Sequence, residues 1–199
     1  MFRTNLAACI GTIAVASAAQ AGFVNFDDGS PNNTVLNSQY AALGVVFSSP
    51  DTFAAYRDML TLGPGYDTTS FPNTAFAAFN GDVQGTLRMD FAAPASGVSF
   101  YAIDVGGSSR DAKAYDSLNN LLETITIHNP GTGPGIGQID AVVFSASNIS
   151  YVTFGQGAFF ELGDGSLIDD LSFNIPSPAS AIAMMGLLLR RRRRRAQLG

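Results

Sequence analysis

Two pairs of adjacent aspartates lie near the ends of the central part of the chain, Asp27-Asp28 and Asp169-Asp170. Calcium is bound in proteins by six to eight oxygen atoms, which aspartate carboxylates and loop carbonyls supply. The first and last strands of a β-sandwich are often neighbours, so the two pairs can converge. The sequence therefore predicts a candidate structural calcium site made of these four aspartates, and calcium is the only cofactor that it suggests.

The alternative is that these acids are solvated. No EF-hand pattern surrounds either pair, and Asp27, Asp28 and Asp170 are also typical of turns or of a sheet edge. Asp169 differs, because it has the same strand parity as Leu171 and Phe173 and is expected to point inward. A buried carboxylate needs a hydrogen-bond partner or an ion.

The sequence patterns that would indicate catalysis are weaker than the one that suggests a calcium site. The single histidine, His128, has no nucleophile motif beside it, since the chain contains neither a G-x-S-x-G elbow nor an H-E-x-x-H pair. A glycoside hydrolase needs two carboxyl groups flanking a sugar bond. The only glutamates are Glu123 and Glu161, and nothing marks either as a proton donor. No catalytic residue is assigned, and we expect a non-catalytic protein, with a glycoside hydrolase as the less favoured alternative.

Aromatic residues suggest a different chemistry, because sugars stack on exposed rings. The chain contains 15 Phe and 6 Tyr but no Trp, which is more typical of a filled core than of a sugar platform. The candidates for exposed rings are Tyr56, Tyr66, Phe71, Tyr101, Tyr115 and Tyr151. A lectin-like, glycan-binding module is therefore an alternative function, without an assigned site.

The charge distribution excludes nucleic acid as a partner. The formal net charge is −5, but six of the eleven basic residues are Arg190 to Arg195. Residues 22–175 contain four basic and all sixteen acidic residues, a net charge of −12. Such a domain repels phosphates. The only cysteine is Cys9, so this domain has no disulfide and no cysteine-bound zinc.

The elements that would hold these residues are short strands. Alternating or β-branched runs separated by Gly, Pro, Asn and Asp predict an all-β fold, an antiparallel β-sandwich or jelly roll. The expected strands are Phe23–Phe26, Val45–Ser48, Thr86–Phe91, Gly97–Val105, Leu121–Ile127, Ile139–Phe144, Ile149–Phe154 and Leu167–Phe173. A break is expected at Ala93-Pro94, a short helix or loop at Thr52–Leu62, and a loop at Asn129–Gly137.

The N-terminus has the pattern of a secretion signal. Arg3 supplies a positive charge, and residues 6–19 are apolar or small throughout. Ala19 and Ala21 flank Gln20 in the small-x-small arrangement that signal peptidase cleaves, which predicts a signal helix over 1–21 and a mature start at Gly22.

The C-terminus consists of three parts in a fixed order. Pro176, Ser177 and Pro178 end the folded domain, since proline cannot lie inside a helix or a central strand. An apolar stretch follows over 179–189, which as a helix would measure about 16–17 Å against a bilayer core of about 30 Å. Six arginines, beginning with Arg190, Arg191 and Arg192, come next. An arginine run behind an apolar segment indicates a cytoplasmic anchor.

This order resembles the PEP-CTERM sorting signal of bacterial envelope proteins, in a variant with Ser177 where the family has glutamate. The resemblance covers about 25 residues and implies a precursor held in the inner membrane by a short apolar helix. An exosortase then cuts near the Pro-x-Pro motif, and the product passes to the outer envelope or the extracellular matrix. The apolar segment, like Ser177, departs from the family's pattern, since it is on the short side.

The central part also resembles β-domains that carry this tail, and many carbohydrate-binding jelly rolls. The shared features are Phe26-Asp27-Asp28, Tyr40–Phe47, Val98–Ile103, Ala114-Tyr115-Asp116 and Ile168–Phe173. In such jelly rolls a structural ion often ties the two ends of the domain together.

The expected organisation is a signal peptide at 1–21, a β-domain at 22–174 and a sorting tail at 175–199. The expected function is an exported, non-catalytic surface or matrix protein associated with exopolysaccharide. Its expected partners are signal peptidase, an exosortase, the membrane and extracellular polysaccharide.

Overall fold

The computed structural model describes most of the central part of the chain. The described residues are 19–28, 31–50, 53–58, 69, 73–79, 82–83, 85–103, 109–128, 138–155 and 167–176. Ala19 to Ile175 form one compact unit. The expected signal helix, the apolar C-terminal helix and the motif residues Ser177, Pro178 and Arg190 to Arg192 lie outside the described residues.

The described part of the chain is built from strands and one short 3-10 helix, η1 (Ala41–Leu43). The strands are β1 (Ala19–Val24), β2 (Val45–Ser48), β3 (Phe53–Asp58), β4 (Asn73–Phe79), β5 (Asp82–Val83), β6 (Leu87–Ile103), β7 (Arg110–Tyr115), β8 (Leu121–Ile127), β9 (Ile139–Val143), β10 (Ser147–Gly155) and β11 (Leu167–Pro176). The prediction of an all-β fold is confirmed. Within these residues, no helix has the length and apolar character needed to cross a membrane.

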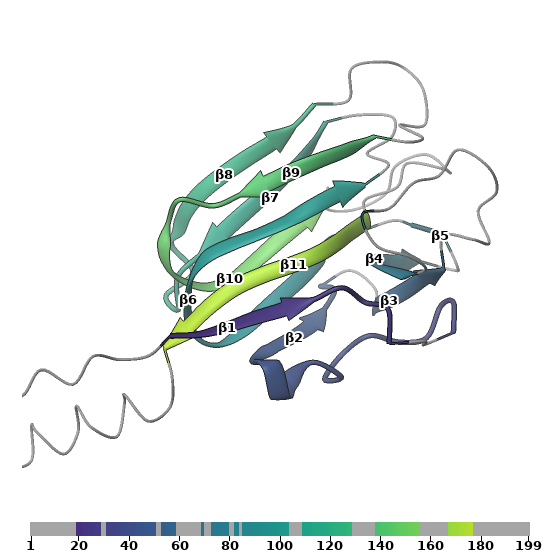
Figure 1. Ribbon diagram of the computed structural model, residues 1–199. Coiled ribbons are helices and arrows are strands. Elements are labelled where there is room, and N and C mark those ends of the chain that lie inside the picture. Colours follow the sequence, from purple (N-terminus) through teal and green to yellow (C-terminus); the bar gives the residue numbers. More distant parts are fainter. Residues whose placement is uncertain are drawn as a thin grey trace, which may run out of the picture. The chain divides into compact units, whose positions relative to one another are not determined.

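All eleven strands belong to one hydrogen-bonded sheet, whose main path is β3-β4-β11-β6-β10-β7-β8. Every pairing with a defined register is antiparallel, as expected. The two halves of β6 have different neighbours: its first residues pair with β2 and β10, and its last pair with β9 and β11. The sheet therefore curls around the core along this one long strand (Figure 1).

The continuity of β6 corrects one expectation. The Ala93-Pro94 break was expected to separate two strands, but β6 runs through it. Between the pairs Asp90↔Tyr151 and Ala95↔Ile149, β6 contains extra residues, so the ladder is irregular there. Proline has no N–H to donate, and it is tolerated in a sheet at such a bulge. Pro94 therefore bends the strand without ending it.

Four strands, β3, β4, β5 and β7, were not expected, and in β3 and β7 most of the inward residues are alanine. Phe53–Asp58, expected as helix or loop, is strand β3, with Ala54, Ala55 and Tyr56 buried. In β7 the inward residues are Arg110, Ala112 and Ala114. Alanine carries little β-propensity, so these runs lack the signal that strand patterns give.

The core lies inside the curl and is rich in phenylalanine. Alternation sends Leu87, Met89 and Phe91 of β6 inward, together with Val152 and Phe154 of β10. The rings of Phe26, Tyr40 and Phe47 meet edge to face, with centroids 5.5–6.0 Å apart, the arrangement that aromatic quadrupoles favour.

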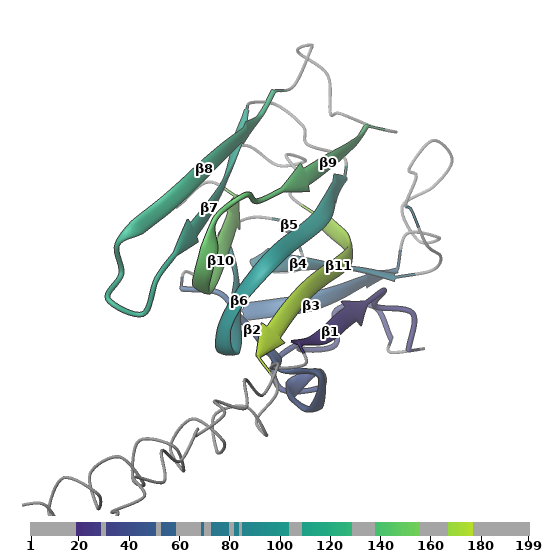
Figure 2. The same cartoon turned by 60° about the vertical axis from the view of Figure 1, so that its left-hand side comes forward.

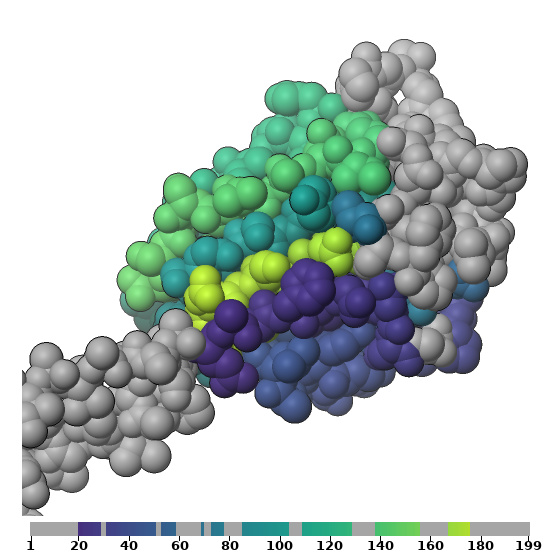
Figure 3. Space-filling model, in the orientation of Figure 1, coloured from purple at the N-terminus to yellow at the C-terminus, as the bar shows by residue number. Residues whose placement is uncertain are grey.

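The first and last strands are neighbours, since β1 pairs with β11. The start of β1 lies beside the end of β11 in both ribbon views (Figures 1 and 2), and β1 runs along β11 on the molecular surface (Figure 3). Gly22 packs directly on Phe173, because a Cβ at Gly22 would lie 2.3 Å from a carbon of that ring. Both ends of the folded unit therefore lie at the same edge.

Candidate functional site

Three aspartates of the expected calcium site, Asp27, Asp28 and Asp169, accept hydrogen bonds from the protein through their carboxylates. Asp28 follows β1, and its Oδ2 accepts hydrogen bonds from the hydroxyls of Tyr40 (3.1 Å) and Tyr56 (2.8 Å). Asp27 accepts one from the backbone N–H of Asn73 on β4 (3.1 Å). These bonds join the segment after β1 to the strands that it packs against.

Asp169 is fully buried, which confirms that it points inward with Leu171 and Phe173. Its Oδ2 accepts a hydrogen bond from the Thr69 hydroxyl (3.0 Å), and its Oδ1 accepts one from the backbone N–H of Asp170 (2.9 Å). Asp170 has a left-handed backbone, with φ 50°, where the pairing of β11 with β6 shifts register.

The convergence of these aspartates into a metal site is not seen. Among the described residues, which include all four, no group of three or more His, Cys, Asp or Glu side chains is arranged to hold a metal ion. Calcium needs six to eight oxygen ligands. The donors to Asp27, Asp28 and Asp169 include hydroxyls, backbone N–H groups and the Asn25 side-chain amide, and the calcium site stays a prediction.

The surroundings of Tyr40, which include Asp28, change the pKa of its hydroxyl. Burial raises the pKa of the Tyr40 hydroxyl far above its ordinary value, and the hydroxyl of Tyr56 and the carboxylate of Asp28 raise it further. Both neighbours disfavour a phenolate at this position. Tyr40 therefore stays a hydrogen-bond donor in the folded protein.

A different group of polar side chains gathers on the outer side of the sheet. Because Leu87, Met89, Ala112, Ala114, Val152 and Phe154 point inward, the residues between them point outward. We call this surface the tyrosine face; it consists of Arg88, Asp90, Asp111, Lys113, Tyr115, Tyr151 and Thr153. It spans three neighbouring strands, β6, β10 and β7.

Register aligns the tyrosine face in two rows. In the first row Tyr151 lies opposite Asp90 on one side and Tyr115 on the other. In the second row Thr153 lies opposite Arg88 and Lys113. Aromatic rings and charged groups therefore occupy adjacent rows of one surface.

Tyr115 and Tyr151 of the first row form a stack of three side chains with Arg88 of the second row. The rings of Tyr115 and Tyr151 are nearly parallel, 11° apart with centroids 4.7 Å apart. The guanidinium carbon of Arg88 lies 3.7 Å from the centroid of the Tyr151 ring. Since β6 and β7 flank β10 on opposite sides, Arg88 and Tyr115 cover opposite faces of Tyr151. This explains why Tyr151 is only 9% exposed.

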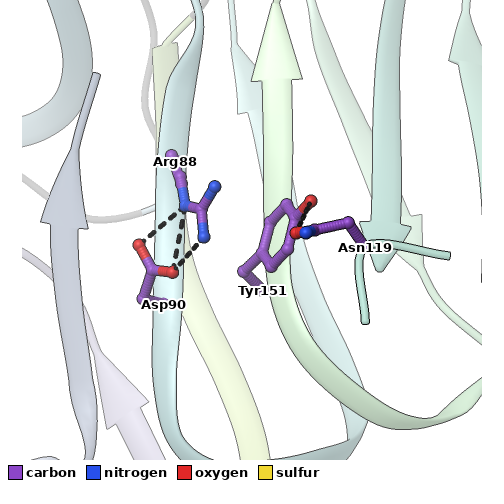
Figure 4. Close-up of polar contacts among 4 residues, drawn as sticks. All are labelled: Arg88, Asp90, Asn119 and Tyr151. Atoms are coloured by element: carbon purple, nitrogen blue, oxygen red, sulfur yellow. Dashed lines mark hydrogen bonds and ion pairs between the residues drawn. The ribbon is translucent and has the colours of Figure 1, made fainter. Parts of the chain in front are cut away.

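Hydrogen bonds hold two members of the stack, Arg88 and Tyr151 (Figure 4). Arg88 donates to both carboxylate oxygens of Asp90, at 2.6–3.0 Å, and these bonds raise the pKa of its guanidinium. The Tyr151 hydroxyl donates to Oδ1 of Asn119 (3.1 Å). Asn119 has a left-handed backbone, with φ 63°, in the turn between β7 and β8. There Asp116 accepts the backbone N–H groups of Leu118 and Asn120.

Lys113 of the second row forms a second ion pair, with Asp111, which lies opposite Gly155 beyond that row. Lys113 and Asp111 lie 3.1 Å apart, and each side chain is 37% exposed. The hydroxyl of Thr126 on β8 donates to Asp111 (2.8 Å). This bond, followed by Lys113, lowers the pKa of the Asp111 carboxyl. Each positive charge on the tyrosine face is thus matched by an aspartate on its own strand.

The residues considered for catalysis do not form a site among the described residues. Oε2 of Glu123 accepts from the backbone N–H groups of Ser145 (2.9 Å) and Ala146 (2.8 Å) and from the Ser145 hydroxyl (3.2 Å), which ties β8 to the turn before β10. His128 is exposed at the end of β8, with its Nδ1 3.2 Å from the Ser109 hydroxyl. Glu161 lies outside the described residues.

The sequence singled out Tyr115 and Tyr151, but it did not predict that they lie on one surface with Arg88 and Asp90. Tyr115 and Tyr151 were among the expected exposed aromatics, yet Tyr151 is almost fully buried. Alternation in Thr86–Phe91 already sets Arg88 and Asp90 on the outward side. The signal that was missed is the register, which brings residues 88, 115 and 151 together.

Comparisons with known proteins identify no family: no family model and no curated protein matches the chain. Two solved structures are similar in part. One is a fucose-binding module of Streptococcus pneumoniae, with 13% identity and a TM-score of 0.25, covering 81% of this chain and 92% of that one. The other is an isomalto-dextranase of Arthrobacter globiformis complexed with panose, with 11% identity and a TM-score of 0.31, covering 79% of this chain and 33% of that one. Both TM-scores are below 0.5, so neither similarity supports an argument about function.

Proposed function

We propose that this chain is an exported, non-catalytic protein of a bacterial cell envelope that associates with extracellular polysaccharide. Its precursor is held in the inner membrane by the C-terminal tail. Signal peptidase removes residues 1–21, and an exosortase cuts near Pro176-Ser177-Pro178. The released β-domain then joins the outer envelope or the extracellular matrix.

One structural observation supports this proposal: the pairing of β1 with β11. The chain enters the folded unit at Ala19 and leaves it at Ile175, and these ends lie at the same edge of the sheet (Figures 1 and 2). A domain held at a membrane through both termini needs its two connections on the same side. Cuts at these neighbouring positions release the domain without dividing its core.

The predicted signal cleavage lies within a strand. β1 begins at Ala19, so a cut after Ala21 removes three of its six residues. Gly22 to Val24 remain, with Gly22 against Phe173 and Val24 buried. The residues that this cut removes precede the two contacts that anchor β1 in the core.

The hydrolase alternative is less well supported. A glycoside hydrolase needs one carboxyl group free to protonate the leaving oxygen and another free to act as nucleophile or base. The carboxylate of Glu123 accepts three hydrogen bonds that hold the turn before β10. Its surroundings are those of a structural residue.

Mass spectrometry of the protein made by its own cells tests the proposal. We expect a product that begins at Gly22 and ends near Pro176, recovered from the envelope or the medium. In a Pro176→Ala/Pro178→Ala variant, the same N-terminus and an uncut tail are expected. Recovery of the intact chain, with both ends present, from the soluble cytosol would contradict the proposal.

A further inference from the structure

We infer that the tyrosine face is a binding site for a neutral polysaccharide, with the side of the Tyr115 ring turned away from Tyr151 as its stacking platform. The inference rests on the proposed association with extracellular polysaccharide and gives that association a site and a ligand class. It is carried by the juxtaposition of two stacked tyrosines and two ion pairs on one sheet surface.

The platform is Tyr115 and not Tyr151. Both faces of the Tyr151 ring are covered, one by Arg88 and the other by Tyr115. Tyr115 is half-buried; one face of its ring lies against Tyr151, and on the other side Tyr115 pairs with Leu121 of β8, a residue that is 54% exposed. Its remaining surface can contact the apolar face of a sugar ring, while Tyr151, held by Asn119, fixes its orientation.

The neighbouring charges suit hydroxyl groups. A sugar hydroxyl both donates and accepts hydrogen bonds, so it is best bound where a donor and an acceptor lie side by side. The face offers two such pairs, Arg88 with Asp90 and Lys113 with Asp111. The side chains of Arg88 and Asp90 are 34% and 40% exposed, so both pairs remain accessible from solvent. They are also preorganised, since each is formed without a ligand.

The charge balance favours a neutral ligand. Each cation of the face is already paired with an aspartate, so an anionic polymer would have to displace a carboxylate. Residues 22–175 carry a net charge of −12, which disfavours the approach of polyanions. Of the two other basic residues in this range, Arg110 is buried and Arg57 is half-buried near the Phe76 ring.

The length of the face fits a chain rather than one sugar. Arg88, Thr153 and Lys113 lie on three successive strands, which are about 4.8 Å apart. The second row therefore extends over about 10 Å, the order of two sugar units. A polymer that crosses the strands would meet both ion pairs while one of its rings stacks on Tyr115.

The test uses the full-length chain, purified in mild detergent. Affinity electrophoresis compares neutral polymers (dextran, galactomannan and xyloglucan) with anionic ones (alginate and polygalacturonate). We expect at least one neutral polymer to retard the protein and both anionic polymers to leave its mobility unchanged. Retardation by none of the neutral polymers, or stronger retardation by an anionic one, overturns the inference.

Variants locate the site. Tyr115→Ala removes the platform, and a loss of about tenfold in affinity is expected, which corresponds to about 1.4 kcal/mol. Tyr101→Ala is the matched control, because Tyr101 is a 38% exposed tyrosine on the part of β6 that pairs with β9 and β11. Equal affinities of the two variants overturn the inference.

A second variant separates a loss of binding from a loss of the fold. Thr153→Glu inserts a larger, negative side chain between Arg88 and Lys113, where opposite charges favour it, so the fold should be retained while the surface is blocked. We expect a native unfolding midpoint and a loss of binding; retained binding overturns the inference. The measurement uses purified protein, so a failure of export or processing leaves its result unaffected, and a failure of binding leaves the processing experiment unaffected.

Discussion

Arg88 covers one face of the Tyr151 ring, with its guanidinium carbon 3.7 Å from the ring centroid. Asp90 holds the same guanidinium through both carboxylate oxygens, and Tyr115 covers the opposite face of the ring. A polar outer surface thus contains an ordered aromatic group. Its order comes from side chains of three strands that are far apart in the sequence.

We predict that removal of the Arg88 charge destabilises the fold. Arg88→Met keeps most of the aliphatic stem but removes the cation–π contact and the ion pair, and a loss of about 1 kcal/mol in the free energy of unfolding is expected. Urea unfolding followed by far-UV circular dichroism measures it. Lys113→Met, which removes only a surface pair, should cost less than about 0.5 kcal/mol. Equal losses in the two variants would contradict a role for the stack.

A second prediction concerns alkaline pH. The folded-state pKa of Tyr40 is raised above its ordinary value of 10.0, first by burial and then by Tyr56 and Asp28. Below pH 10 the hydroxyl is protonated in both states, so its contribution to stability is fully present. Above pH 10 the unfolded chain releases the proton first, and the free energy of unfolding falls as the pH rises.

The Tyr40→Phe variant tests this linkage. It should be less stable at pH 7, because the hydrogen bond to Asp28 is lost. It should also lose less stability than the native chain between pH 9.5 and 11.5, as followed by urea unfolding. Tyr101→Phe serves as a control for the removal of an exposed hydroxyl. Parallel declines in the native chain and in Tyr40→Phe would rule out the raised pKa.

The fold class was predictable because it depends on local patterns. Alternation in Thr86–Phe91 and β-branched residues in Leu121–Ile127 indicate strands without knowledge of their partners. β3, β4, β5 and β7 were missed; in β3 and β7 alanine occupies most of the inward positions, and its low β-propensity weakens the sequence signal. The bend at Pro94 was mistaken for a break, since the tolerance for proline depends on the pairing opposite it.

The candidate site was less predictable because it depends on register. A shift of one residue in β10 would turn Tyr151 into the core and Val152 toward Arg88. The inward position of Asp169 could be predicted from parity within one strand. The hydrogen-bond partners of Asp27 and Asp28 could not, because they come from other segments of the chain, Asn73 on β4, Tyr56 on β3 and Tyr40 before η1.

A third prediction addresses the bonds of Glu123. Glu123→Ala leaves two backbone N–H groups and the Ser145 hydroxyl without their acceptor, and a loss of about 1–3 kcal/mol in the free energy of unfolding is expected. Glu123→Gln keeps an oxygen and should lose less. Thr124→Ala, at an exposed neighbouring position, should change stability by less than about 0.5 kcal/mol. Calorimetric unfolding gives these values, and a Glu123→Ala protein as stable as Thr124→Ala would refute the structural role.

The fourth prediction separates hydrogen bonding from metal binding at Asp169. Its buried carboxylate accepts from the Thr69 hydroxyl and from the backbone N–H of Asp170, and no metal-binding group of three acids is seen among the described residues. EDTA should therefore leave the thermal unfolding midpoint of the native chain unchanged. Asp169→Ala should lower the free energy of unfolding by about 1–3 kcal/mol, because buried donors lose their acceptor.

Asp169→Asn and added calcium complete this test. The amide keeps one acceptor oxygen, so Asp169→Asn should be more stable than Asp169→Ala in the presence and absence of EDTA. If calcium stabilised the native fold, calcium would raise the unfolding midpoint of the native chain by mass action, and Asp169→Asn would reduce that rise. Such a difference would show that the carboxylate binds an ion as well as its protein donors, and the hydrogen-bond account of Asp169 would be wrong.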